Sequence, residues 1–365
     1  MTGFRLHFYS DEIDEILDKV RIALSSGQLS LGPYANQLER AFAELIGVPY
    51  TVSANSGFSA LEIILRYYDT AGKEVLVPAN TNYATAASVL AAGATVTFYD
   101  SGLYPSIESI KSRLTGSTAA IVVVHVAGYI SPDVWAIRDI CKARGIPLIE
   151  DAAHAFGAAL DGVAAGGIGD AAAFSLFPSK VVTTGEGGMV VTSDEQLSIV
   201  ARQLRNHGKR LGSEVSERIG GSWRMTELGA AIGLVQLKRF SIDLQRRNAI
   251  SAMYRCELGA VEGICFPEPV AEQILSGYKT VAILDGRTDR VALKKSLATR
   301  GVEIEKEVYG APLYNHPVFE RYADGTPLER AEYFTRHHIC LPNWRHMTDA
   351  DVRSVARAVR ASLNS

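Results

Sequence analysis

The sequence has 365 residues, of which 47% are hydrophobic and 21% charged, and its formal net charge is −3. This length predicts two domains with a sizeable core, and the small net charge without a Lys/Arg run argues against nucleic-acid or acidic-membrane partners. The chain has no apolar stretch of the roughly 18 residues that cross a bilayer, and its start, MTGFRLHFYSDEIDEIL, is too acidic for a signal peptide, so we expect a soluble, cytoplasmic protein.

The first half of the chain alternates between predicted strands and predicted helices. Two amphipathic helices come first, at residues 11–26 and 34–46. The pattern that follows predicts helices at 58–68, 83–92 and 133–144, and strands at 75–81, 95–100, 119–128, 146–151, 170–176 and 188–193. Strands separated by helices of about ten residues indicate a mostly parallel sheet with helices on both faces.

The alternation of predicted strands and helices ends near residue 225. A long helical region is predicted at 225–257, followed by a strand at 281–285 and helices at 289–299 and 349–362. We therefore expect a large α/β domain, residues 1–250 with the N-terminal helices included, and a smaller α+β domain, residues 251–365.

The cysteines predict no metal site. Cys141, Cys256, Cys265 and Cys340 are scattered and form no CxxC motif, whereas a zinc site needs clustered thiols or imidazoles.

Ligands of open α/β sheets bind at the carboxyl ends of the strands, and two side chains with useful chemistry are predicted there. Asp151 follows the strand IPLIE and is either a helix cap or a functional carboxylate. Lys180 follows AAFSLFPS, before the glycine-rich VVTTGEGG, and is either solvated or held in a desolvated pocket as a nucleophilic amine. Ser175, on the same segment, is a candidate hydrogen-bond donor to a phosphate.

The stretch SANSGFSALEIILR predicts an anion site at a helix start. Asn55 and Ser56 are natural caps, Gly57 permits a ligand to approach closely, and the free amides that follow suit a phosphate. A phosphate cradle, a carboxylate and an amine are the parts of a site for pyridoxal 5′-phosphate (PLP), in which the amine binds the coenzyme covalently and the carboxylate keeps the pyridine nitrogen protonated.

Several long stretches, in order, resemble the DegT/DnrJ/EryC1/StrS aminotransferases, fold-type-I PLP enzymes that aminate keto-sugars, mostly nucleotide-linked. The resemblance covers nearly the whole chain and is carried by SSGQLSLGPYANQLERAFAE, IEDAAHAFGA, GDAAAFSLFPSKVVTTGEGGMVVTSDE, LRNHGK and WRMTELGAAIGLVQLKR. It implies a seven-stranded type of sheet flanked by helices and a smaller C-terminal α+β domain.

The resemblance also implies residue roles. Lys180 is expected to be the Schiff-base lysine and proton shuttle, Asp151 to pair with the pyridine nitrogen, and His154 to lie near the ring face and phenolic oxygen. Phosphate binding is expected from Ser175 and from the amides of Gly57 and Phe58. Lower-ranked substrate contacts are Arg224, Tyr314 and His316.

Three positions, and the stretch LPNW at 341–344, depart from the family pattern. Phe58 replaces a threonine of the cradle, so Ser59 is a candidate for the missing hydroxyl. Asn82 occupies the slot of an aromatic that stacks on the ring, with Tyr83 next to it as a stacking candidate or an outward-facing residue. Ser222 replaces an asparagine that reaches the neighbouring subunit's phosphate.

The resemblance predicts amino transfer from an amino acid, L-glutamate by family likeness, to a keto-sugar, in a homodimer whose subunits share active sites. Cyclitol or other carbocyclic ketones, another PLP reaction on sugars, and a non-catalytic PLP-binding regulator are the alternatives. A deoxysugar dehydratase is disfavoured by Lys180, because that branch has histidine there. A dinucleotide-binding protein is disfavoured because SANSGF is not a G-x-G-x-x-G turn.

Overall fold

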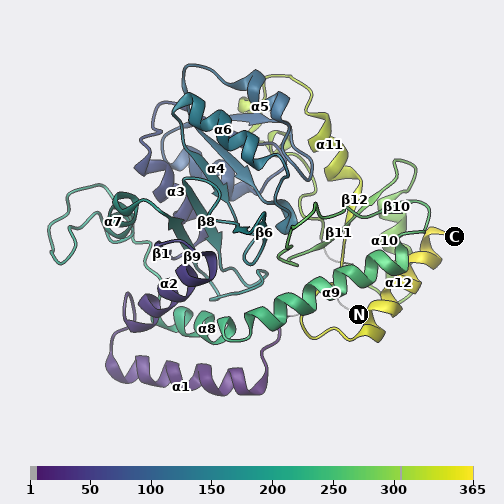
Figure 1. Ribbon diagram of the computed structural model, residues 1–365, viewed down its shortest axis with the longest axis horizontal. Helices are drawn as coiled ribbons and strands as arrows, with labels where there is room; N and C mark the ends of the chain where they lie inside the picture. Colours follow the sequence, from purple (N-terminus) through teal and green to yellow (C-terminus); the bar gives the residue numbers. More distant parts are fainter. Residues whose placement is uncertain (1–5, 305, 365) are drawn as a thin grey trace.

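The computed structural model describes residues 6–304 and 306–364 and has a seven-stranded sheet at its centre (Figure 1). The strand order is β1-β9-β8-β5-β4-β2-β3. Only β9 runs antiparallel to its neighbours, so the sheet is mixed but mostly parallel, as predicted. Its strands are β1 (Tyr50–Ala54), β2 (Glu74–Pro78), β3 (Thr95–Tyr99), β4 (Thr118–Val124), β5 (Leu148–Asp151), β8 (Ala171–Ser175) and β9 (Gly188–Thr192).

Helices cover both faces of this sheet because its strands bury apolar side chains in both directions. In β2, Val75 and Val77 belong to one hydrophobic cluster and Leu76 to another on the opposite face. One face is covered by α3 (Gly57–Tyr67), α4 (Tyr83–Ala91) and α7 (Glu195–Leu204). The other is covered by α2 (Pro33–Ile46), α5 (Ile107–Arg113) and α6 (Val134–Arg144).

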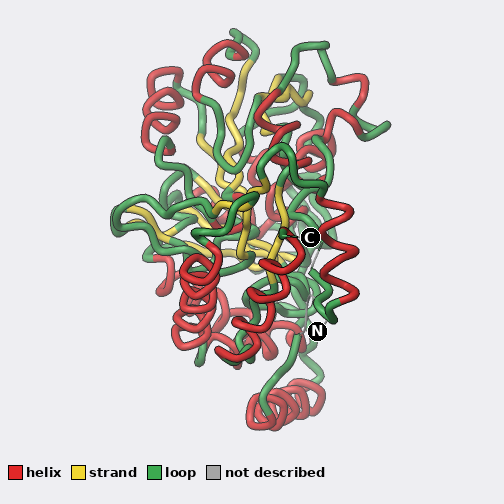
Figure 2. Tube along the Cα trace, turned by 90° about the vertical axis from the view of Figure 1, so that its right-hand side faces the viewer, coloured by secondary structure: helices red, strands yellow, loops and turns green. Residues whose placement is uncertain are grey.

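The helix α1 (Ser10–Ser26) lies at one edge of the molecule, against α8 (Glu227–Leu237). Figure 2 shows it end-on at the bottom, apart from the layers around the sheet. No helix in the described part of the chain is long and apolar enough to span a membrane.

A second, antiparallel sheet lies in the C-terminal part, in the order β10-β11-β12. Its strands are β10 (Ile264–Cys265), β11 (Thr280–Leu284) and β12 (His338–Leu341), and its helices are α9 (Phe240–Leu258), α10 (Arg290–Thr299), α11 (Glu329–Arg336) and α12 (Asp349–Leu363). The long helix α9 follows α8 end to end, and α12 lies beside its C-terminal part (Figure 1). The expected domain boundary, between residues 250 and 251, falls inside α9, and the division into two domains stays a prediction.

The structure differs from the sequence prediction in several short elements. The helical region 225–257 is interrupted at Lys238–Arg239, which separates α8 from α9. The predicted strand 119–128 ends at Val124, and a 3-10 turn (Val126–Gly128) follows, in which Ala127 has a φ of 57°. Elements without a sequence prediction are β1, α5, the hairpin β6 (Ala159–Leu160) and β7 (Val163–Ala164), α7, β10, α11, β12 and two 3-10 turns (Leu313–Asn315 and Glu320–Tyr322).

A buried carboxylate fastens α2 to α8. Glu227 is 1% exposed, and its side chain accepts hydrogen bonds from the backbone N–H groups of Gly32, Tyr34 and Ala35, at 2.7–2.9 Å. These donors lie at the start of α2, where the helix dipole favours a negative charge. The glutamate of the TELGAAIG stretch is therefore a capping residue.

Replacing Glu227 by alanine is expected to lower the free energy of unfolding by about 2–4 kcal/mol, because two buried donors and one partly buried donor lose their acceptor. Urea titration of the variant measures this. Glu44→Ala, a change at an exposed position of α2, is the control and should stay within about 0.5 kcal/mol of the unmodified protein. An equally small effect of Glu227→Ala would contradict the capping role.

Candidate active site

A cavity of about 390 Å³ opens at the carboxyl ends of the central strands. It brings together residues that follow β1, β2, β5 and β8, the edge at which the sequence predicted a site. Its lining comprises Ser56, Gly57, Phe58, Leu61, Asn82, Ala84, Asp151, Ala153, His154, Ala173, Ser175, Phe177, Ser179, Lys180, Glu186, Tyr278, Val308 and Tyr309.

Asp151 is the last residue of β5 and is buried, with 6% of its surface exposed. One carboxylate oxygen accepts a hydrogen bond of 2.7 Å from the Thr85 hydroxyl, and the other accepts one of 3.1 Å from the backbone of Ala153. These bonds fix the carboxylate beside the cavity and leave room for a further, charged partner.

Lys180 lies in the loop between β8 and β9, and its amine is 4.9 Å from the centre of the Tyr278 ring. Burial lowers the pKa of this amine to about 8; Asp151 opposes the shift, and the neighbouring Lys279 adds to it. A lysine with this pKa is half neutral at pH 8, and a neutral amine is the nucleophilic form.

This pKa predicts the reactivity of the cofactor-free protein. Labelling of Lys180 by an amine-directed reagent should rise with a midpoint near pH 8, whereas an unperturbed lysine titrates near 10.4. Peptide-level mass spectrometry across pH 6–11 measures the midpoint for each lysine. A midpoint above pH 10 for Lys180 would contradict the desolvated position.

The start of α3, for which the sequence predicts an anion cradle, has free backbone donors. Ser56 caps the helix through its hydroxyl, which accepts from the backbone of Ser59, whereas the N–H groups of Gly57 and Phe58 have no hydrogen-bond partner among the described residues. A Cβ at Gly57 would approach the Cβ of Ser175 to 3.0 Å. The free amides thus lie close to the Ser175 side chain, and the positive end of the helix dipole faces the cavity.

His154 is buried and lies flat against an aromatic side chain. Its ring stacks on Tyr278, with centroids 4.2 Å apart and planes 19° apart, and more loosely on Tyr309, at 5.9 Å and 24°. Burial lowers the pKa of His154 well below its ordinary value, and the positive charges of Lys180 and Lys279 act in the same direction. The imidazole is therefore neutral at neutral pH.

Two of the expected cofactor contacts do not face the cavity. Tyr83 is 53% exposed, and its ring lies 5.6 Å from that of Phe319, whereas Asn82 does line the cavity and caps α4. The Ser59 hydroxyl donates to Asn55 at 2.7 Å and lies 3.0 Å from that of Ser56, so it is used within the cap.

The other expected contacts lie away from this cavity. Arg224 donates to Asn206 and Ser222 at 2.8 and 2.7 Å, in the segment that follows α7. Tyr314 donates to Glu332 at 2.9 Å and lines a separate cavity of about 270 Å³, and His316 lies two residues further along. Within one chain, none of these side chains reaches the residues around Lys180.

Tyr278 and Tyr309 are site residues that sequence reasoning missed. Both come from the C-terminal part of the chain, in irregular segments before β11 and before the 3-10 turn at Leu313–Asn315. Neither lies in a stretch with helical or strand periodicity, so the sequence alone carried no signal for them. Thr85 was also missed, although its position in the helix after VPANT could have suggested it.

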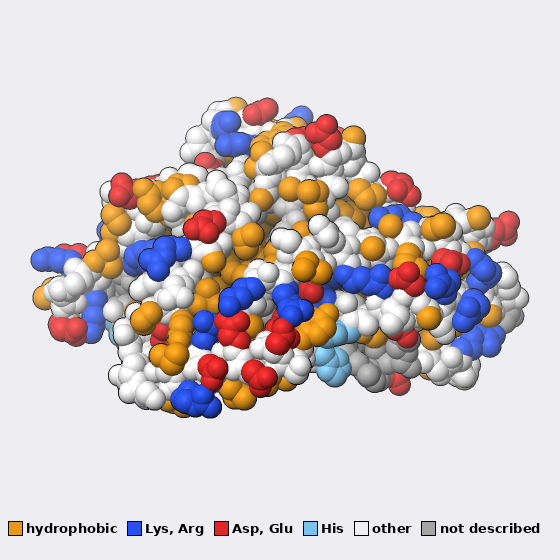
Figure 3. All heavy atoms as spheres, turned by 60° about the horizontal axis from the view of Figure 1, so that its bottom comes forward, with side chains coloured by type: hydrophobic (Ala, Val, Ile, Leu, Met, Phe, Trp, Pro, Cys, Tyr) orange, Lys and Arg blue, Asp and Glu red, His pale blue; other side chains and the backbone are white. Residues whose placement is uncertain are grey.

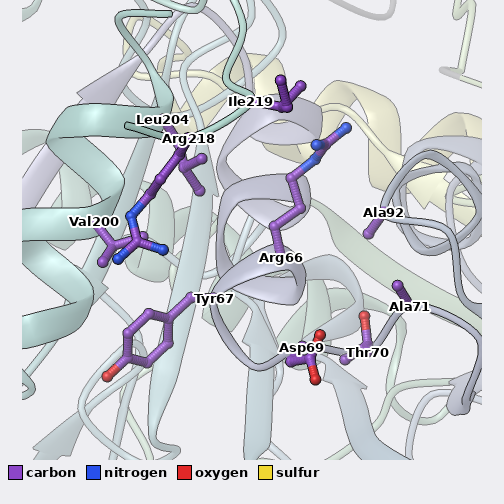
Figure 4. Close-up of a pocket in the computed structure, with 10 residues that line it drawn as sticks. All are labelled: Arg66, Tyr67, Asp69, Thr70, Ala71, Ala92, Val200, Leu204, Arg218 and Ile219. Atoms are coloured by element: carbon purple, nitrogen blue, oxygen red, sulfur yellow. The ribbon is translucent and has the colours of Figure 1, made fainter. Parts of the chain in front are cut away.

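A second cavity, of about 480 Å³, lies at the opposite end of α3 (Figure 4). Arg66 and Arg218 extend into it from α3 and from the segment after α7. Arg66 pairs with Glu62 at 2.7 Å, and the Tyr67 hydroxyl donates to Asp194 at 2.5 Å. The described residues that line this cavity include no lysine, so we assign the chemistry to the cavity around Lys180.

Comparison with known proteins agrees with this geometry. Residues 10–360 match the DegT/DnrJ/EryC1/StrS aminotransferase family. The chain belongs to this family. It is accordingly a PLP-dependent aminotransferase of the sugar aminotransferase type, and its fold is that of fold-type-I aminotransferases.

Relatives within the family cover the whole length of the chain. The GDP-perosamine synthase of Vibrio cholerae is 30% identical over 92% of both chains. The UDP-N-acetyl-3-dehydro-alpha-D-glucosamine 3-aminotransferase of Acidithiobacillus ferrooxidans is 31% identical over 100% of this chain and 98% of its own. A putative sugar aminotransferase of Streptococcus pneumoniae, solved in its PMP form, is 26% identical and superposes with a TM-score of 0.89 over 100% of this chain and 99% of its own.

Proposed function

We propose that this protein transfers an amino group from L-glutamate to a nucleotide-linked keto-sugar, with PLP bound to Lys180. The observation that carries the proposal is the meeting of Lys180, Asp151 and the free amides of Gly57 and Phe58 in one cavity. The relatives named above, a GDP-sugar enzyme and a UDP-sugar aminotransferase, support a nucleotide-linked substrate.

The residues present suit PLP in charge and in shape. Unpartnered amides at the start of α3, together with Ser175, provide donors for a phosphate. A Cβ at Gly188 would lie 2.2 Å from the Ser56 carbonyl oxygen, so only glycine lets β9 pass this close to the cradle. The Asp151 carboxylate suits a protonated ring nitrogen, and the Lys180 amine suits an aldehyde.

When bound, PLP supplies an aldehyde that takes up amino groups and a ring that delocalises the electrons of the substrate Cα–H bond. Lys180 would hold the coenzyme through its amine. A free Lys180 amine would accept the proton from the substrate Cα and would release it again as the ammonium form, and a pKa of about 8 suits both directions of this transfer. Asp151 would hold the proton on the pyridine nitrogen, and the neutral His154 adds no charge to the cavity.

We also propose a homodimer in which the segment after α7 reaches the partner's site. This segment projects from the body of the molecule (Figure 1) and exposes Leu211, Val215 and Ile219, the last to 86%. Other exposed apolar side chains lie on α1, among them Leu17 and Ile22. Figure 3 shows apolar side chains gathered on the face of the molecule that is at the bottom in Figure 1. Ser222 and Arg224 would contact substrate or phosphate only across such an interface.

The test is amino transfer itself. Purified PLP-loaded protein should lose its visible absorbance when L-glutamate is added, release 2-oxoglutarate, and recover the absorbance with a nucleotide-linked keto-sugar. Free keto-sugars and carbocyclic ketones are tested as alternative amino acceptors in the same assay. An unchanged spectrum with glutamate and glutamine would contradict amino transfer, and recovery with carbocyclic ketones alone would contradict the substrate class. A folded, PLP-loaded monomer by light scattering would contradict the dimer.

A further inference from the structure

The C-terminal part of the chain contributes one side chain that contacts two of the groups expected to act on the coenzyme, His154 and Lys180. Tyr278, two residues before β11, stacks on His154 with 4.2 Å between centroids. The Lys180 amine lies 4.9 Å from the centre of the same ring, within the range of a cation–π interaction. One aromatic ring therefore touches an imidazole that follows β5 and an amine that follows β8.

The backbone around Tyr278 is fastened to the segment that carries His154. The Ser276 hydroxyl donates to the carbonyl oxygen of His154 at 2.6 Å and accepts from the backbone N–H of Tyr278 at 3.2 Å. Gly277 has a φ of 65°, and a Cβ there would lie 2.5 Å from the side chain of Arg247. These contacts restrict the conformation of the turn, and the Tyr278 side chain lines the cavity.

The hydroxyl end of Tyr278 is held as well. The Ser179 side chain, which precedes Lys180, hydrogen-bonds to it. Other charged or titratable groups around the amine are Asp151 at the end of β5, His154 after it, Lys279 beside Tyr278, and Glu186 and Tyr309 in the cavity wall. Among the residues that the structure describes, Tyr278 contacts both His154 and Lys180 through its ring face.

We propose that Tyr278 is a positioning residue whose ring holds His154 parallel to the cavity wall and keeps the Lys180 amine over its face. The inference rests on the proposed function for its consequence in catalysis, but the contacts exist without the coenzyme. It gives the C-terminal part of the chain a direct role in arranging the two groups that follow β5 and β8.

The test compares a variant that keeps the ring with one that removes it. Tyr278→Phe retains the stack and the cation–π contact, whereas Tyr278→Leu fills the space without a π face. In cofactor-free protein, the labelling midpoint of Lys180 should stay within about 0.2 pH units in Tyr278→Phe. It should fall by about 0.5–1.5 units in Tyr278→Leu, because the charged amine loses the ring that stabilises it.

A second readout follows turnover of the loaded enzyme. Tyr278→Leu should lower kcat about 10- to 100-fold with little change in KM, and Tyr278→Phe should restore kcat to within about threefold. Tyr278→Met is the second ring-free variant if the leucine protein fails to fold, and far-UV circular dichroism checks each one.

Equal labelling midpoints for the phenylalanine and ring-free variants, or a raised midpoint without the ring, would overturn the proposal. Because labelling needs neither coenzyme nor substrate, this result is separate from a failure of the proposed function. If the unmodified protein bound no PLP, the amino-transfer assignment would fall while the labelling contrast still decided the role of Tyr278.

Discussion

Replacing Lys180 by alanine is expected to reduce amino transfer by at least about 10³-fold, because both the covalent anchor and the proton carrier are lost. PLP should still bind through the cradle and Asp151, but without the visible absorbance of the attached form. Steady-state rates with glutamate, together with an absorbance spectrum of the loaded variant, measure both effects.

Two controls separate this loss from misfolding. In Lys180→Arg the guanidinium stays protonated at ordinary pH and cannot act as a nucleophile or base, so this variant should be as inactive as the alanine variant. Lys111→Ala, at an exposed position of α5, should be fully active. The far-UV circular dichroism spectrum of Lys180→Ala should match that of the unmodified protein, which shows that the variant is folded. Activity above about a tenth in Lys180→Ala would contradict the assignment.

The second large effect is expected from Asp151→Asn. The amide keeps the shape of the side chain and an acceptor for the Thr85 hydroxyl, which lies 2.7 Å away, but it loses the negative charge that would face the ring nitrogen. We expect kcat/KM to fall on the order of 10²–10³-fold, the usual cost of removing a charge-stabilising group from an active site.

In the cofactor-free protein, the labelling midpoint of Lys180 provides an independent test of Asp151→Asn. Asp151 favours the charged form of Lys180, so its removal should move the Lys180 labelling midpoint below the unmodified value of about pH 8. Asp161→Asn, on the surface turn between β6 and β7, is the matched control for an aspartate change and should move neither quantity. An unchanged midpoint in Asp151→Asn would place the carboxylate too far from the amine for its assigned role.

Much of the fold follows from local patterns in the sequence. The apolar strands β2, β4 and β5, and the helices between them, lie within a few residues of their predicted ranges, because buried parallel strands leave continuous apolar runs. The strand β12, with the sequence HICL, was not predicted, because a four-residue segment carries too little periodicity to be distinguished from a loop.

The site was predictable where its residues follow strands in sequence and unpredictable where tertiary structure brings them in. Asp151, Lys180 and Ser175 sit at the ends of recognisable strands, and the structure places all three in one cavity. Tyr278 and Tyr309 arrive from another part of the chain through loops whose positions depend on long-range packing. Tyr83, the first residue of α4, is exposed, and its local sequence did not distinguish this position from one that faces the cavity.

The central claim is that Lys180 and no other lysine binds the coenzyme covalently. The most direct measurement is borohydride reduction of the PLP-loaded protein, followed by proteolysis and mass spectrometry of the peptides. We predict the mass of one reduced coenzyme per chain on the peptide that contains Lys180. Attachment to Lys279, which also lies close to the Tyr278 ring, or no stable attachment at all, would contradict the account.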